Sequence, residues 1–96
     1  MNETFMKKLT VMVVDSDGEL SFEIDNMLMQ RVKNIHYVKD PAEAIGDFGR
    51  IVPQLVIIDL KLAIMDIVDF SAKIKNLNSE CEIIVVLGFI EPHKLI

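Results

Sequence analysis

The chain has 96 residues, close to the length of one ordinary domain, so we expect residues 1–96 to form a single domain. Hydrophobic residues make up 51% of the sequence and charged residues 26%, a composition that excludes an intrinsically disordered chain. The 15 acidic and 10 basic residues give a net charge of -5, which is the wrong sign for binding nucleic-acid phosphates or an anionic membrane. We therefore expect neither as a direct partner.

The cysteine content and the apolar runs indicate the compartment. A lone Cys81 cannot form an internal disulfide, which suits a reducing environment. The run from Ile83 to Ile90 has eight residues, whereas a membrane-spanning helix needs about 20. We expect a cytoplasmic protein without a membrane span or a targeting segment.

Four short apolar segments rich in β-branched residues predict strands that are buried in a parallel sheet. They are Leu9–Val14, Ile35–Val38, Leu55–Ile58 and Ile83–Leu87.

Between the first two strands the apolar period becomes helical. The expected apolar face of this first helix consists of Leu20, Ile24, Met27 and Leu28, widened by Phe22 and Met29.

The start of the second helix is predicted by Asp40-Pro41-Ala42-Glu43, which combines an N-cap, a proline at the first helical position and a capping-box glutamate. Ala44, Ile45 and Phe48 should line its buried side, while Gly49 and Pro53 mark its end.

A third helix is expected from about Asp66 to Leu77, with Phe70, Ile74 and Leu77 on one face. The alternation of strands and helices is typical of right-handed βαβ units. The predicted fold is therefore a three-layer, doubly wound α/β sandwich of the flavodoxin-like type, with a parallel sheet in the order 2-1-3-4.

Ligands of such sheets bind beyond the carboxyl ends of the strands, where the strand order reverses. Asp15 and Asp17 follow the first strand and Asp59 follows the third, and these two strands should be neighbours. Converging carboxylates repel each other unless a cation lies between them, and oxygen ligands of this kind suit Mg2+.

These segments resemble the receiver domains of two-component response regulators. The resemblance rests on Val-Met-Val-Val-Asp15-Ser16-Asp17, on Leu55-Val-Ile-Ile-Asp59 with the following Leu60 to Asp66, and on Ile83-Ile-Val-Val-Leu87-Gly88. It covers essentially the whole chain, although the fifth β/α unit of the family and its lysine are missing from the 96 residues.

The resemblance implies a CheY-like signalling module rather than an enzyme. Asp59 matches the aspartate that accepts a phosphoryl group from a histidine kinase or phosphotransfer protein. Asp15 matches one acid of the Mg2+ site, to which Asp59 itself and the backbone carbonyl of Lys61 also contribute. A downstream protein partner is implied as well.

Departures from the family pattern predict impaired phosphorylation. Ser16 replaces the second acid of the metal site, so Mg2+ binding should be weak, and Asp17 is the candidate to compensate. Leu87 occupies the switch position, where the family has a Thr or Ser that hydrogen-bonds the phosphoryl group. Ala63, Ile64 and Ile67 replace the small residues of the loop after the acceptor.

Two other functions remain open. A degenerate receiver would keep the scaffold and bind a protein partner without being phosphorylated. Alternatively, Asp15-Ser16-Asp17-Gly18 is similar to the start of haloacid-dehalogenase-type phosphatases, in which Asp15 would be the nucleophile and Asp17 the general acid. A flavodoxin-type cofactor site is less consistent with the sequence, because the first strand ends in acids and not in a phosphate-binding loop.

The fourth strand is expected to form an exposed apolar edge of the sheet, guarded only at its start by Glu80 and Glu82. Such an edge invites pairing with another chain, so we expect a homo-oligomer that forms through it.

Overall fold

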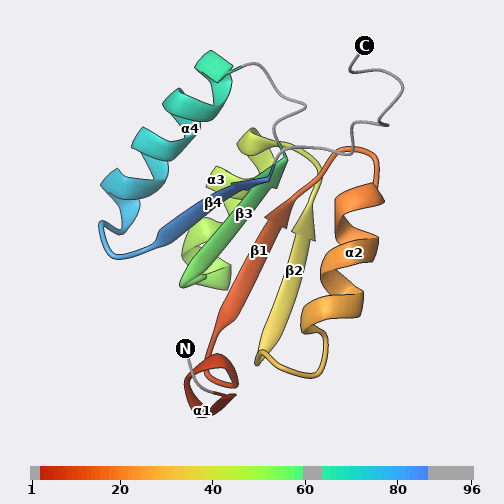
Figure 1. Cartoon of the computed structure of the whole chain (residues 1–96). Helices are drawn as coiled ribbons and strands as arrows, with labels where there is room; N and C mark the ends of the chain where they lie inside the picture. The colour runs from red at the N-terminus through yellow and green to blue at the C-terminus, as the bar shows by residue number, and fades with distance from the viewer. Residues whose placement is uncertain (1–2, 60–63, 87–96) are drawn as a thin grey trace.

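The computed structural model describes residues 3–59 and 64–86 of the chain. Helices and strands alternate along it (Figure 1), and the four strands form one parallel sheet in the order β2-β1-β3-β4. The predicted α/β class and strand order are therefore confirmed. The elements are α1 (Glu3–Met6), β1 (Thr10–Val14), α2 (Glu19–Leu28), β2 (Asn34–Val38), α3 (Pro41–Ile51), β3 (Leu55–Asp59), α4 (Ile64–Leu77) and β4 (Glu82–Val86).

Strand β1 is central and pairs on both sides. Val14 lies opposite Val38 of β2 and opposite Ile58 of β3. Each residue of β1 is buried, because helices cover both faces of the sheet at this strand. This double burial explains why the segment is continuously apolar and does not alternate with polar residues.

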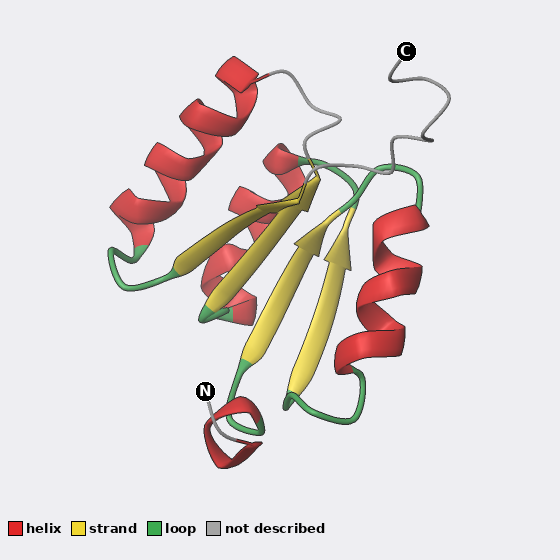
Figure 2. Cartoon of the chain, in the orientation of Figure 1, coloured by secondary structure: helices red, strands yellow, loops and turns green. Residues whose placement is uncertain are grey.

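The helices form two outer layers (Figures 1 and 2). Helices α3 and α4 cover one face, where Phe48, Phe70 and Ile74 pack against β1 and β3. Helix α2 covers the other face, where Leu20 and Ile24 pack against Val11, Val13 and Ile57. Successive residues of β1 and β3 thus contribute to opposite cores, as the two-residue period of a strand requires.

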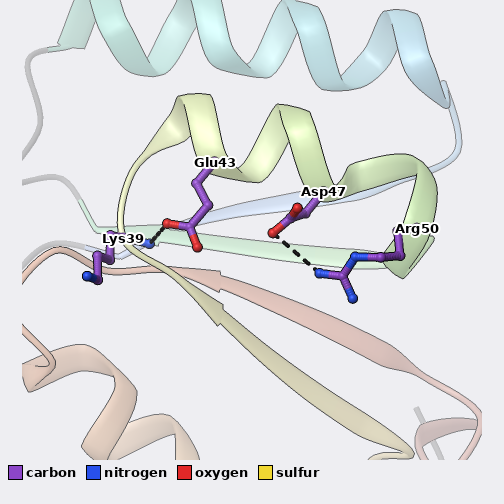
Figure 3. Close-up of polar contacts among 4 residues, drawn as sticks. All are labelled: Lys39, Glu43, Asp47 and Arg50. Carbon is purple, nitrogen blue, oxygen red and sulfur yellow. Dashed lines mark hydrogen bonds and ion pairs between the residues drawn. The ribbon is translucent and has the colours of Figure 1, made fainter.

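The start of α3 confirms the predicted capping residues. Asp40 is the N-cap, Pro41 is the first helical residue, and Oε2 of Glu43 accepts a hydrogen bond from the backbone N–H of Lys39 at 3.0 Å (Figure 3). One helical turn further on, Asp47 pairs with Arg50 at 3.4 Å on the surface of the same helix.

Helix α3 ends at Ile51, between Gly49 and Pro53, the two residues that were predicted to mark its end. The left-handed residue that closes it is Val52, with φ 51°, and its backbone N–H donates to the carbonyl of Phe48 at 2.8 Å. Pro53 has no N–H with which to continue the helix, so the helix must end here. A single glycine within a helix lowers its stability by only about 1 kcal/mol and does not by itself terminate it.

The width of the apolar face of α2 was overestimated. Leu20 and Ile24 are buried, but Phe22, Met27 and Met29 are 67%, 63% and 63% exposed. A helix that lies on a flat sheet buries only one narrow stripe, so apolar side chains outside that stripe reach solvent. Leu77, the last residue of α4, was expected on the same face as Phe70 and Ile74 but is exposed.

Strand β4 lies at the edge of the sheet and, among the residues described, pairs only with β3. Ile84 and Val85 of this strand are 48% and 41% exposed. Helix α1, a single turn before β1, is an element that the sequence analysis did not predict. None of the helices described is both long and apolar enough to cross a membrane.

Candidate functional site

Two buried carboxylates lie at the carboxyl ends of the central strands. Asp59 is the last residue of β3, and Asp15 directly follows β1 and continues its ladder by donating its backbone N–H to the carbonyl of Val38 at 2.9 Å. Because Val14 is paired with Ile58, the two aspartates occupy the next positions on neighbouring strands. Asp15 is 7% exposed and Asp59 is 5% exposed. Neighbouring parallel strands are about 4.8 Å apart, so the backbones of Asp15 and Asp59 lie side by side at the carboxyl end of the sheet.

The carboxylate of Asp15 is held on one side only. Its Oδ2 atom accepts two hydrogen bonds from Ser21, one from the backbone N–H and one from the hydroxyl Oγ, each at 2.8 Å. Its Oδ1 atom is buried and has no hydrogen-bond partner among the described residues. A buried carboxylate oxygen without a partner is costly, so this atom marks a place where a cation or a donor group belongs.

The loop between β1 and α2 explains this arrangement. The N-cap residue is Gly18, whose φ of 84° lies in the left-handed region and which has no side chain to cap the helix. The free N–H groups of the first turn are bonded by upstream acids instead: Asp17 Oδ1 accepts from Glu19 at 3.0 Å, and Asp15 accepts from Ser21. Both aspartates therefore act as helix caps.

The three predicted carboxylate ligands do not form one cluster. Asp17 is exposed and directed to the first turn of α2, and within the described ranges no three acidic, histidine or cysteine side chains converge in a way that could hold a metal ion. The structure does bring Asp15 and Asp59 together at the carboxyl ends of β1 and β3. One or two carboxylates plus water satisfy Mg2+, so the partnerless Oδ1 of Asp15 beside the acidic strand end of Asp59 fits this ion.

Two of the predicted site residues fall outside the part of the chain that the structure describes. They are Lys61, whose backbone carbonyl is the expected metal ligand, and Leu87, at the expected switch position. Ser16, which replaces an acid of the family pattern, is exposed in the loop that joins β1 to α2.

Ser21 is a residue of the site that the sequence analysis missed. Its spacing from Asp15 looks like that of an ordinary polar residue on a helix surface. The available signal is that a hydroxyl residue occurs in the first turn of a helix whose N-cap is glycine, where a bond to a neighbouring acid replaces the missing cap.

Cys81 is the one cysteine of the chain and takes no part in this site. It is fully buried just before β4, at the opposite end of the strands. Burial raises the pKa of its thiol above the ordinary value, although nearby Lys75 acts in the opposite direction. It is therefore a packing residue and not a reactive nucleophile.

Comparison of the sequence with protein-family models and with curated proteins returns no match in either case. Solved structures do match. The chain is 24% identical, with a TM-score of 0.68, to the signal receiver domain of a protein described as a Luxo repressor from Vibrio parahaemolyticus, over 91% of this chain and 67% of that one. It is 21% identical, with a TM-score of 0.64, to the N-terminal domain of an uncharacterized protein from Wolinella succinogenes, over 91% of this chain and 70% of that one.

The parallel sheet and its strand order define the doubly wound α/β class. Proteins of this class bind ligands at the carboxyl ends of the central strands, where Asp15 and Asp59 lie buried. Within that class, the structural matches show the fold of a signal receiver domain. The chain spans about two thirds of the length of the matched chains.

Proposed function

We propose that this chain is a receiver domain of a two-component phosphorelay, with Asp59 as the residue that accepts the phosphoryl group. The observation that carries the proposal is the position of Asp59 beside Asp15 on adjacent central strands of a receiver-type sheet. A histidine kinase or phosphotransfer protein would be the phosphodonor, and a further protein would read the phosphorylated state. The lone, buried Cys81 is compatible with a cytosolic setting.

The chemistry requires a positioned nucleophile and stabilised charge. A carboxylate oxygen of Asp59 would form the new bond to phosphorus while the bond from phosphorus to the donor nitrogen breaks, leaving an aspartyl phosphate and a free imidazole. Asp15, through its Oδ1 atom, Asp59 and the carbonyl of Lys61 would hold Mg2+. When bound, this ion would neutralise the negative charge of the carboxylates and the incoming phosphoryl group.

Phosphorylation of Asp59 should be slow. Ser16 presents a neutral hydroxyl where the family pattern has an acid, and Leu87 cannot hydrogen-bond a phosphoryl oxygen. Loss of one electrostatic stabiliser commonly lowers a rate on the order of 10² to 10³-fold. We therefore expect small phosphodonors to phosphorylate Asp59 far more slowly than they phosphorylate a receiver with a complete acidic pair.

Intact-mass measurement tests the proposal. The folded protein is incubated with Mg2+ and a small acyl phosphate, beside Asp59→Asn and the control Asp69→Asn, which changes an exposed carboxylate of α4. We expect one phosphoryl adduct on the wild type and on the Asp69 variant, and none on the Asp59 variant. An adduct that persists in Asp59→Asn would overturn the assignment.

A degenerate receiver is the second candidate, favoured by Ser16 and Leu87. In that case no adduct forms on a folded sample at any Mg2+ concentration, and the scaffold acts by binding a partner protein. The phosphatase alternative requires Asp17 as a general acid. Its Oδ1 atom instead accepts a hydrogen bond from the backbone N–H of Glu19, as a helix cap does, which argues against that function.

We also propose that β4 pairs with β4 of a second copy. The strand is paired on one side within the described residues, and Ile84 at its centre is half exposed. Antiparallel pairing about Ile84 would place Glu82 opposite Val86 of the other copy, whereas parallel pairing would place like charges together. The antiparallel dimer is the arrangement that the charge pattern favours.

A further inference from the structure

Ser21 is the residue that determines which oxygen of Asp15 remains available. Its backbone N–H and its hydroxyl both donate to Oδ2 at 2.8 Å, and a carboxylate oxygen has two lone-pair directions to offer. Oδ2 is therefore fully engaged. Oδ1 of the same side chain is buried and accepts no hydrogen bond from the described residues.

We propose that Ser21 is a positioning residue for a divalent-cation site, and that it orients Asp15 to bind Mg2+ through Oδ1 alone. This inference rests on the proposed function, since it needs a cation site formed by Asp15 and Asp59. It goes beyond that function by assigning a role to a residue of α2 and by fixing a monodentate geometry for Asp15.

The physical argument is that a ligand held in advance loses less conformational freedom on binding. Asp15 is buried in the loop before α2, and two bonds from one residue fix its χ1 and χ2 angles. Residues that hydrogen-bond a ligating carboxylate typically change metal affinity by about 10 to 100-fold when they are replaced. Removal of the hydroxyl leaves the backbone bond intact, so the lower end of that range applies.

Calorimetric titration with MgCl2 tests the inference on the full chain. We expect Ser21→Ala to bind Mg2+ about tenfold more weakly than the wild type, and Ser21→Thr, which keeps a hydroxyl, to bind within about twofold of it. The matched control is Ser71→Ala, a serine of α4 on the other side of the sheet, which should bind like the wild type. Circular dichroism confirms that each variant is folded.

The outcomes separate the two claims. Equal or tighter binding by Ser21→Ala, with the wild type binding Mg2+, overturns the role of Ser21 and leaves the proposed function standing. Loss of binding in a folded Ser21→Thr also overturns it. If the folded wild type does not bind Mg2+ at tens of millimolar, both the cation site and the role of Ser21 are rejected, whereas acyl-phosphate labelling of Asp59 reports on the acceptor separately.

Discussion

The carboxylate of Asp40 accepts a hydrogen bond from the backbone N–H of Glu43 at 2.8 Å. In return, the side chain of Glu43 accepts one from the backbone N–H of Lys39, immediately before the cap. Two N–H groups that would otherwise lack partners are satisfied by this exchange. The start of α3 is thereby fixed directly after β2, at the same end of the strands as Asp15 and Asp59.

Replacement of Asp40 by alanine should destabilise the protein. Loss of an N-cap typically costs about 1 kcal/mol of unfolding free energy. Urea denaturation monitored by circular dichroism measures the change. The control is Asp69→Ala, which breaks an exposed ion pair with Lys73 and should cost less than about 0.5 kcal/mol. Equal effects of the two variants would contradict the capping role.

Restoration of a second acid should strengthen the cation site. Ser16 is exposed next to Asp15, and Ser16→Asp adds one carboxylate at this position. We expect Mg2+ to bind on the order of tenfold more tightly, which corresponds to about 1.4 kcal/mol. Ser79→Asp, which adds the same charge in the exposed turn before β4, should leave the affinity unchanged. If both variants gain equally, the effect is one of net charge and not of ligation.

Two residues that were predicted on one face of α4, Ile74 and Leu77, should respond differently to truncation. Ile74 is fully buried against the sheet, so Ile74→Ala should lower the unfolding free energy by about 2 to 5 kcal/mol. Leu77 is 55% exposed, and Leu77→Ala should change it by less than about 0.5 kcal/mol. Chemical denaturation of both variants provides the comparison, and a large loss for Leu77 would show that this side chain is packed.

Cys81 should make stability depend on alkaline pH. Burial raises the pKa of its thiol in the folded state above that of the unfolded chain. The contribution is fully present below the unfolded pKa and is lost as the pH rises above about 9 toward the folded pKa. We expect the unfolding free energy to fall more steeply between pH 8 and 10 in the wild type than in Cys81→Ala. Parallel pH profiles would disprove the shift.

A charge at the centre of β4 should prevent self-association. Ile84→Lys places an ammonium group opposite its own copy in the antiparallel pairing proposed above. We expect the wild type to sediment as a dimer at tens of micromolar and the variant as a monomer. Val68→Lys, which changes a similarly exposed residue of α4, serves as the control and should still dimerise. A wild type that sediments as a monomer at this concentration would rule out the proposed interface.

The order of elements could be predicted from the sequence because burial on both faces leaves a clear pattern. The Val11–Val14 run is apolar throughout, and each predicted strand agrees with the observed strand to within one residue over the residues described. The exposure of Met27 and Met29 could not be predicted in this way. Helical spacing indicates which residues share a face, but the partner surface decides how wide a stripe becomes buried.

The candidate site was partly predictable for a similar reason. Asp15 and Asp59 stand out because each follows or ends a buried strand, and the parallel topology brings the carboxyl ends of neighbouring strands together. The bond from Ser21 to Asp15 depends on the left-handed turn at Gly18, a three-dimensional detail without a sequence period. Asp17 was expected at the cation site, but the same turn directs it to the first N–H of α2.

The wholly parallel sheet also has a consequence for how the chain folds. Thr10 is paired with Asn34 and Val11 with Leu55, so the two partners of β1 lie 24 and 44 residues further along the chain, the differences 34-10 and 55-11. Among the four strands described, no adjacent pair can form as a local hairpin, and each contact waits for a crossover to be completed. During synthesis, β1 would emerge before the other three strands described and remain without its second neighbour until β3 had been made. The strand that is buried at every position is thus the one that needs protection for the longest time on the ribosome.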